Sequence, residues 1–205
     1  MFARKFACGC AIAALAIIVA SPGEAAGQQS PPLIHRFETP GNLQSNYKLD
    51  CIPASAAKNV YTPADLYKAV RKCVDAEKYA DGVFLYALAG VYGRFDALRV
   101  VDKTAHQAIL ALQMRELWDT PEPNKDRMQE KWLNAVTDKK QHDELCSKIS
   151  LIGPPNYRPD YMIQHGMDAF NGIQGDGLVG NFDDKAGWGK ALDTYLHCPA
   201  LPIIK

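Results

Sequence analysis

The chain has 205 residues, of which 47% are hydrophobic and 22% charged, and its formal net charge is zero. This composition is typical of a folded globular protein and excludes an intrinsically disordered chain. The balanced charge also excludes the strongly basic surface that nucleic-acid-binding proteins use, so we expect no nucleic-acid partner.

Residues 1–27 have the pattern of a secretory signal peptide. Arg4 and Lys5 form a basic start, an apolar run covers residues 6–20, and small residues occupy positions 25–27. The apolar run is shorter than the roughly 20 residues that a membrane-spanning helix needs. We therefore expect export to the periplasm or the extracellular space, with no membrane span left after the leader is removed.

The chain that follows the leader is long enough for one domain with a substantial core. Loss of Arg4, Lys5 and Glu24 leaves 21 basic and 22 acidic residues, a formal charge of −1. That charge gives no electrostatic reason to bind a nucleic acid or an anionic membrane surface.

Four cysteines remain outside the leader, namely Cys51, Cys73, Cys146 and Cys198. In an oxidising compartment an even number of cysteines predicts disulfides, and four cysteines allow three pairings. We favour Cys51–Cys73 and Cys146–Cys198, because each bond would connect an irregular segment to a neighbouring helix. The spacings contain no C-x-x-C unit, so we expect no metal cluster.

Residues 28–60 are expected to form an irregular N-terminal arm, with a turn at 39–42, where Thr-Pro-Gly-Asn occurs. Residues 61–205 are expected to form a helical domain. Thr62 begins the first helix as an N-cap, with Pro63 in the first helical position and Asp65 in the third.

Apolar residues at helical spacing predict six further helices. Their expected ranges are 76–92, 103–118, 125–136, 138–152, 159–170 and 184–196, with a glycine-rich loop over 171–184. No segment has the alternation and turns of a β-hairpin. The predicted fold class is therefore all-α, a compact domain of six to seven helices. Gly82, Gly90 and Gly93 thin one edge of the second helix, which favours close helix–helix packing.

Residues 66–93 resemble one helical hairpin of the tetratricopeptide or Sel1 kind. The residues that carry the resemblance run from Leu66 to Val70, from Lys78 to Ala80, and from Phe84 to Ala89. In such repeats small and large residues alternate so that stacked hairpins interlock. No second copy follows at a fixed period, so the resemblance implies a single antiparallel hairpin.

The densest group of polar and aromatic residues lies between 156 and 167. The candidate binding residues there are Tyr157, Asp160, Tyr161, Gln164 and His165. Their spacing places Asp160 and Gln164 on one helical face and Tyr161 and His165 on the next, close to a helix N-terminus, which favours anions. The alternative interpretation is a capped helix whose tyrosine and methionine side chains pack inward.

Signatures of catalysis and of cofactor binding are missing from the sequence. The five histidines form no H-E-x-x-H pattern, and the acidic loop at 172–184 lacks the order and the closing glutamate of an EF-hand. We therefore expect no cofactor and no metal, and no residue stands out as catalytic.

Three functions fit these observations. The first is an exported, non-enzymatic protein-binding protein, and in its sharper form an immunity or inhibitor protein that covers the site of a toxin or hydrolase. The second is a cell-envelope hydrolase with a site near Tyr157–His165. The third is an envelope structural or assembly factor.

Overall fold

The computed structural model describes residues 38–199. The predicted signal peptide and the first ten residues of the expected arm lie outside this range. Within it the chain forms two short 3-10 helices and eight α-helices. Their bounds are η1 (Ala54–Ala56), α1 (Pro63–Asp75), α2 (Tyr79–Arg99), η2 (Lys103–Gln107), α3 (Ala108–Leu117), α4 (Glu122–Thr137), α5 (Lys139–Ile152), α6 (Asp160–Ile163), α7 (Asp168–Asn171) and α8 (Asp184–Leu196).

The prediction of an all-α fold is confirmed. Across residues 38–199 the one strand-like pairing is an isolated bridge between Val100 and Leu178. No helix in this part of the chain combines the length and the apolar character that a bilayer crossing requires.

Helix α1 begins as its sequence predicts. The Thr62 hydroxyl accepts the backbone N–H of Asp65, and the Asp65 carboxylate accepts the backbone N–H of Thr62, which is a complete capping box. The second carboxylate oxygen of Asp65 accepts the N–H groups of Asn46 and Tyr47 at 2.6 and 2.7 Å. One buried side chain therefore starts the helix and also holds the N-terminal arm against it.

Helix α2 is longer than predicted, because it continues through Gly93 to Arg99 instead of ending at residue 92. A Cβ atom at Gly90 would overlap the ring of Tyr195 on α8, and one at Gly93 would overlap the side chain of Ile109 on α3. These glycines are therefore contact points between helices, and the local tendency of glycine to end a helix is overridden by packing.

Two segments that were predicted as single helices are divided in the structure. Residues 103–118 form η2 followed by α3, and residues 159–170 form α6 and α7. Asp102 contacts the start of both segments that follow it: its carboxylate caps η2 by accepting the N–H of Thr104 at 2.8 Å, and it accepts the N–H of Asp168, where α7 begins, at 2.9 Å. Gly166 lies between α6 and α7, where a Cβ atom would overlap the same carboxylate.

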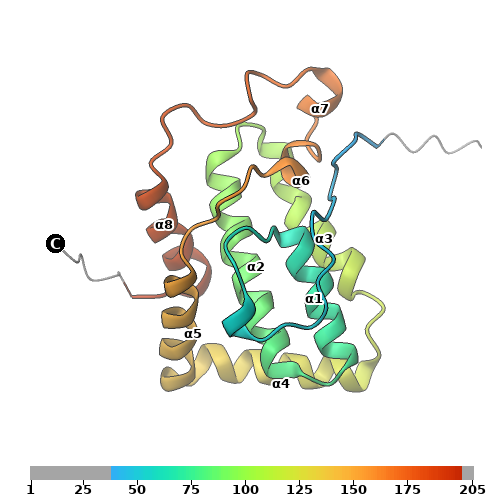
Figure 1. The fold of residues 1–205 in the computed structure, drawn as a ribbon, viewed down its shortest axis with the longest axis vertical. Coiled ribbons are helices and arrows are strands. Elements are labelled where there is room, and N and C mark those ends of the chain that lie inside the picture. Colours follow the sequence, from blue (N-terminus) through green and yellow to red (C-terminus); the bar gives the residue numbers. More distant parts are fainter. Residues whose placement is uncertain (1–37, 200–205) are drawn as a thin grey trace, which may run out of the picture. The chain divides into compact units, whose positions relative to one another are not determined.

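The helices pack around α2. Helices α1 and α2 form the expected hairpin, α8 packs on α2 as well, and α4 crosses one end of the α1–α2 pair (Figure 1). The largest fully buried side chains come mainly from α1 and α2, among them Tyr67, Leu85, Tyr92 and Phe95. A helix that is buried on all sides must be apolar on all sides, and α2 has that character.

Both disulfides join the cysteines in the pairing that the sequence favoured. Cys51–Cys73 connects the N-terminal arm to α1, and Cys146–Cys198 connects α5 to the segment after α8. The bonded cysteines are 22 and 52 residues apart in the sequence, so the second disulfide closes the longer loop.

We expect removal of either disulfide to lower the free energy of unfolding, and the longer loop to cost more. Loop-closure entropy gives about 3 kcal/mol for C51A/C73A and about 4 kcal/mol for C146A/C198A. Urea unfolding of each double variant against the unmodified protein measures both values. The reverse order of the two losses would contradict the entropic account.

We expect Gly90→Ala to destabilise the protein by about 1–3 kcal/mol, because the added methyl group must displace the Tyr195 ring. Gly189→Ala is the matched control, since Gly189 lies in α8 with open space around its Cα. There alanine should stabilise the helix by up to about 1 kcal/mol. Thermal unfolding of the two variants distinguishes a packing role from a propensity effect.

Candidate functional site

The two tyrosines of the predicted binding group point into the protein. The hydroxyls of Tyr157 and Tyr161 both donate to one carboxylate oxygen of Asp96, at 2.9 and 2.8 Å. Asp96 belongs to α2 and is fully buried. In this structure the tyrosines thus connect the segment before α6, and α6 itself, to the central helix.

Arg99 balances the charge of Asp96. Its guanidinium lies 2.7 Å from the other carboxylate oxygen of Asp96 and donates to the backbone carbonyl of Tyr157 at 2.9 Å. The same guanidinium lies over the rings of Phe95 and Tyr157, with its carbon 5.0 and 5.4 Å from the ring centroids. Both carboxylate oxygens of Asp96 and both tyrosine hydroxyls are therefore hydrogen-bonded, which is the condition for a charge inside a core.

Burial raises the pKa of all three acidic side chains in this network, Asp96, Tyr157 and Tyr161. Burial raises the pKa of Asp96, and the charge of Arg99 and the two hydroxyl donors oppose that rise. Burial also raises the pKa of Tyr157 and Tyr161 well above 10, so both hydroxyls keep the protons that they donate. The arrangement holds its protons in place and has the properties of a structural network.

Asp160 and Gln164, the two polar residues predicted to share a helical face, are half-buried. Asp160 is ion-paired with Arg158, and Gln164 lies at the end of α6. Both border a hollow of about 290 Å³ whose lining is polar and comes from the arm and from α6. Its lining residues are Pro40, Gly41, Gln44, Asn46, Asp160, Tyr161 and Gln164.

His165 faces an amide and not an acid. Its Nδ1 lies 2.9 Å from the side-chain oxygen of Asn42 in the N-terminal arm, so Nδ1–H donates to that oxygen. Burial lowers the pKa of His165 below its ordinary value of 6.5. Asn42 orients the ring without the negative charge that would make the imidazole a stronger base.

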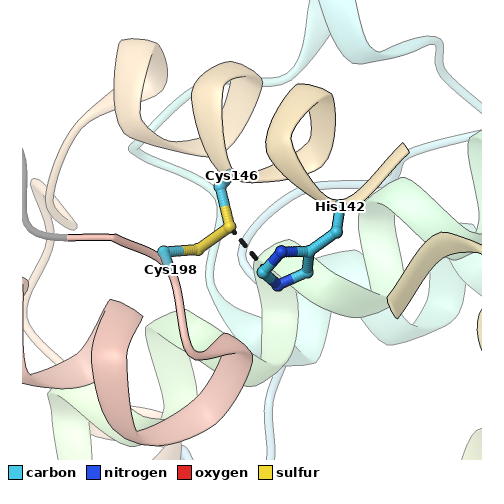
Figure 2. Close-up of side chains that lie close together, drawn as sticks. All are labelled: His142, Cys146 and Cys198. Carbon is cyan, nitrogen blue, oxygen red and sulfur yellow. Dashed lines mark hydrogen bonds between the residues drawn. A yellow bond between two sulfur atoms is a disulfide. The ribbon is translucent and has the colours of Figure 1, made fainter. Parts of the chain in front are cut away.

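A second histidine lies beside a disulfide. Nε2 of His142 lies 3.7 Å from Sγ of Cys146. Figure 2 shows this ring beside the disulfide that joins Cys146 to Cys198. The same Nε2 donates to the backbone carbonyl of Leu196 at 2.6 Å. His142, Cys146 and Cys198 have the composition of a metal-ligand set. However, disulfide sulfurs are not thiolates, and Nε2 is already engaged as a donor, so the oxidised group connects α5 to the end of α8 and the segment that follows it.

The apolar surface of α3 is divided between the core and the exterior. Leu112 is fully buried, whereas Leu110, Met114 and Trp118 are 58%, 50% and 77% exposed. The three exposed residues follow one another at intervals of four and so form one line along the helix, which we call the α3 stripe. All of these residues are apolar and fall within the helix predicted over residues 103–118. The apolar residues of this helix span a wider arc than a single core-facing stripe occupies, and this excess is the sequence pattern that indicates exposed apolar residues.

The chain matches no family model, no curated protein and no solved structure. The fold and the side-chain geometry therefore define its class: an all-α domain with two disulfides, a buried Asp–Arg–Tyr network and an exposed apolar stripe.

We expect the pKa of His165, measured by NMR titration of its ring protons, to lie below 6.5. The folded protein then disfavours the protonated ring. The stability that His165 contributes is fully present above pH 6.5 and decreases as the pH falls through the folded-state pKa. Urea unfolding across this range should show a decrease that is absent in His165→Gln, and a measured pKa of 6.5 or higher would contradict the effect of burial.

Proposed function

We propose that this protein is exported and that its mature chain binds and covers a surface of another protein. In the sharper form of the proposal it is an immunity or inhibitor protein of the periplasm. The leader pattern over residues 1–27 supports export. The two disulfides are also compatible with an oxidising compartment.

The α3 stripe is the observation that carries the binding proposal. Leu110, Met114 and Trp118 expose half or more of their side chains in one line. Exposed apolar residues that gather in this way mark interaction sites in soluble proteins more often than scattered ones do. Tryptophan and methionine are enriched in protein interfaces, and tryptophan is among the residues whose truncation most often costs about 2 kcal/mol or more of binding free energy.

The charges beside the stripe favour an apolar partner surface. Arg115 is paired with Glu116 at 2.7 Å, and Asp119 is paired with Arg71 on α1. These charges are satisfied within the protein and leave little net field to attract a charged ligand. The expected partner surface is therefore apolar at its centre, with polar groups around it.

The alternative of an envelope hydrolase has less support. Its proposed residues border a polar hollow, but Asp160 is ion-paired with Arg158 and His165 is oriented by the amide of Asn42. The hydroxyls of Tyr157 and Tyr161 are occupied by Asp96. A nucleophile paired with a base, which covalent hydrolysis requires, is not among these contacts.

We expect a photo-crosslinking residue at position 114 to capture the partner in cells that express the full chain. The matched control is position 151, because Leu151 is 84% exposed and lies on α5, away from the α3 stripe. The captured protein is then identified by mass spectrometry and purified. Loss of its own enzymatic activity on addition of this chain would support the inhibitor form, and an inactive envelope component would support an assembly factor.

With the purified partner, Trp118→Ala should weaken binding about 30-fold, which is the effect of losing an interface residue worth about 2 kcal/mol. Leu151→Ala should change the affinity less than twofold. Both side chains are exposed, so neither substitution should alter thermal stability. Equal capture from positions 114 and 151, or unchanged affinity in Trp118→Ala, would contradict binding through the α3 stripe.

A further inference from the structure

Three side chains of the kind that bind zinc meet at the disulfide between α5 and the end of α8. His142 and Cys146 are four residues apart on α5, so both lie on one face of this helix. Cys198 reaches the same face through its bond to Cys146 (Figure 2). One ligand atom from each of the three residues lies within 4.8 Å of the other two. Cysteine spacing alone predicted no metal, because the two cysteines are 52 residues apart in the sequence.

The nitrogen and the sulfur on α5 already have the separation of two ligands on one metal ion. Nε2 of His142 lies 3.7 Å from Sγ of Cys146. Zinc binds histidine nitrogen at about 2.0 Å and thiolate sulfur at about 2.3 Å, which places these two ligands about 3.6 Å apart in a tetrahedral site. No movement of α5 is therefore needed for this pair of ligands.

The burial of the two cysteines also favours a divalent cation once their bond is open. Cys146 and Cys198 are 4% and 5% exposed. A buried thiolate needs a compensating charge, and two thiolates balance the charge of one Zn²⁺ ion. His142 is half-buried and adds a neutral ligand. Three protein ligands leave the fourth tetrahedral position for a water molecule.

We propose that the reduced protein binds one Zn²⁺ ion through His142, Cys146 and Cys198. A dithiol reductant opens the disulfide: it supplies two electrons and two protons to the two sulfurs and itself becomes a disulfide. Zn²⁺ then displaces one proton from each thiol. The Nε2 proton of His142, which the Leu196 carbonyl accepts in the oxidised protein, is exchanged through solvent for one on Nδ1, so that the Nε2 lone pair binds the metal.

The metal would take the place of the covalent bond. Two thiolates on one zinc ion are about 3.8 Å apart, so the sulfurs must separate when the site forms. The Cα atoms of Cys146 and Cys198 are 5.6 Å apart, and rotation of the two side chains gives the required separation. The same residues would then connect α5 to the segment after α8 in both redox states. This proposal does not depend on the partner of the α3 stripe.

The test is a zinc titration of the purified protein, with a chromophoric chelator as competitor. The protein is reduced by a phosphine, which does not bind zinc through thiolates. The reduced protein should bind one Zn²⁺ per chain, and the oxidised protein should bind it at least about 100-fold more weakly. C146A/C198A should lose this binding, whereas C51A/C73A should retain it with unchanged affinity.

His142→Ala tests the nitrogen ligand, and in the reduced protein it should weaken zinc binding at least about tenfold. His197→Ala is the matched control, because His197 is exposed and adjacent to Cys198 but is not one of the three ligands. It should leave the affinity unchanged. Circular dichroism follows the fold throughout. Where reduction without zinc unfolds the chain, added zinc should restore the helical signal, because metal binding then supplies folding free energy.

A reduced protein that neither binds zinc nor regains helical signal with it would overturn the proposal. Zinc binding that persists in C146A/C198A would move the site to other residues and would overturn it as well. Equal affinity of the reduced protein and reduced His142→Ala, or a loss in His197→Ala as large as that in His142→Ala, would contradict the assignment of His142 as the third ligand.

Discussion

The burial of α2 is the constraint on which the rest of the structure depends. Thirteen of its 21 residues are buried, where α2 packs against α1, α4 and α8, and all of these except Asp96 and Tyr92 are apolar or small. This packing explains why Gly90 and Gly93 remain helical, since Tyr195 and Ile109 occupy the space that other side chains would need. The small residues of α2 allow side chains of the neighbouring helices to pack directly against its backbone.

Asp96 is the one carboxylate that α2 buries completely, and its partners connect α2 to the segment around α6. A carboxylate in a core is tolerated when its charge and its lone pairs are satisfied. Arg99 supplies the charge, while Tyr157 and Tyr161 reach it from a segment about 60 residues away in sequence. The network therefore joins α6 to α2, and it accounts for the concentration of aromatic residues that made this segment conspicuous.

The exposed apolar side chains lie elsewhere, on α3, and an apolar cavity lies beside α4. The α3 stripe ends at Trp118, which directly follows Leu117, a wall of the apolar cavity. Helix α3 packs on α1, so the helix that carries the stripe is held by the core of the protein.

Patterns within single segments determined the all-α class, the start of α1 at Thr62, and the position of most helices, because capping and helical periodicity act over a few residues. The favoured cysteine pairing also followed from the sequence, since each bond joins an irregular segment to a nearby helix. The tertiary structure decided the length of α2, the separation of α6 from α7 at the Asp102 contact, and the inward direction of Tyr157 and Tyr161. It also decided which apolar residues of α3 face solvent. Each of these depends on a contact between residues far apart in the chain, and local propensity carries no information about such contacts.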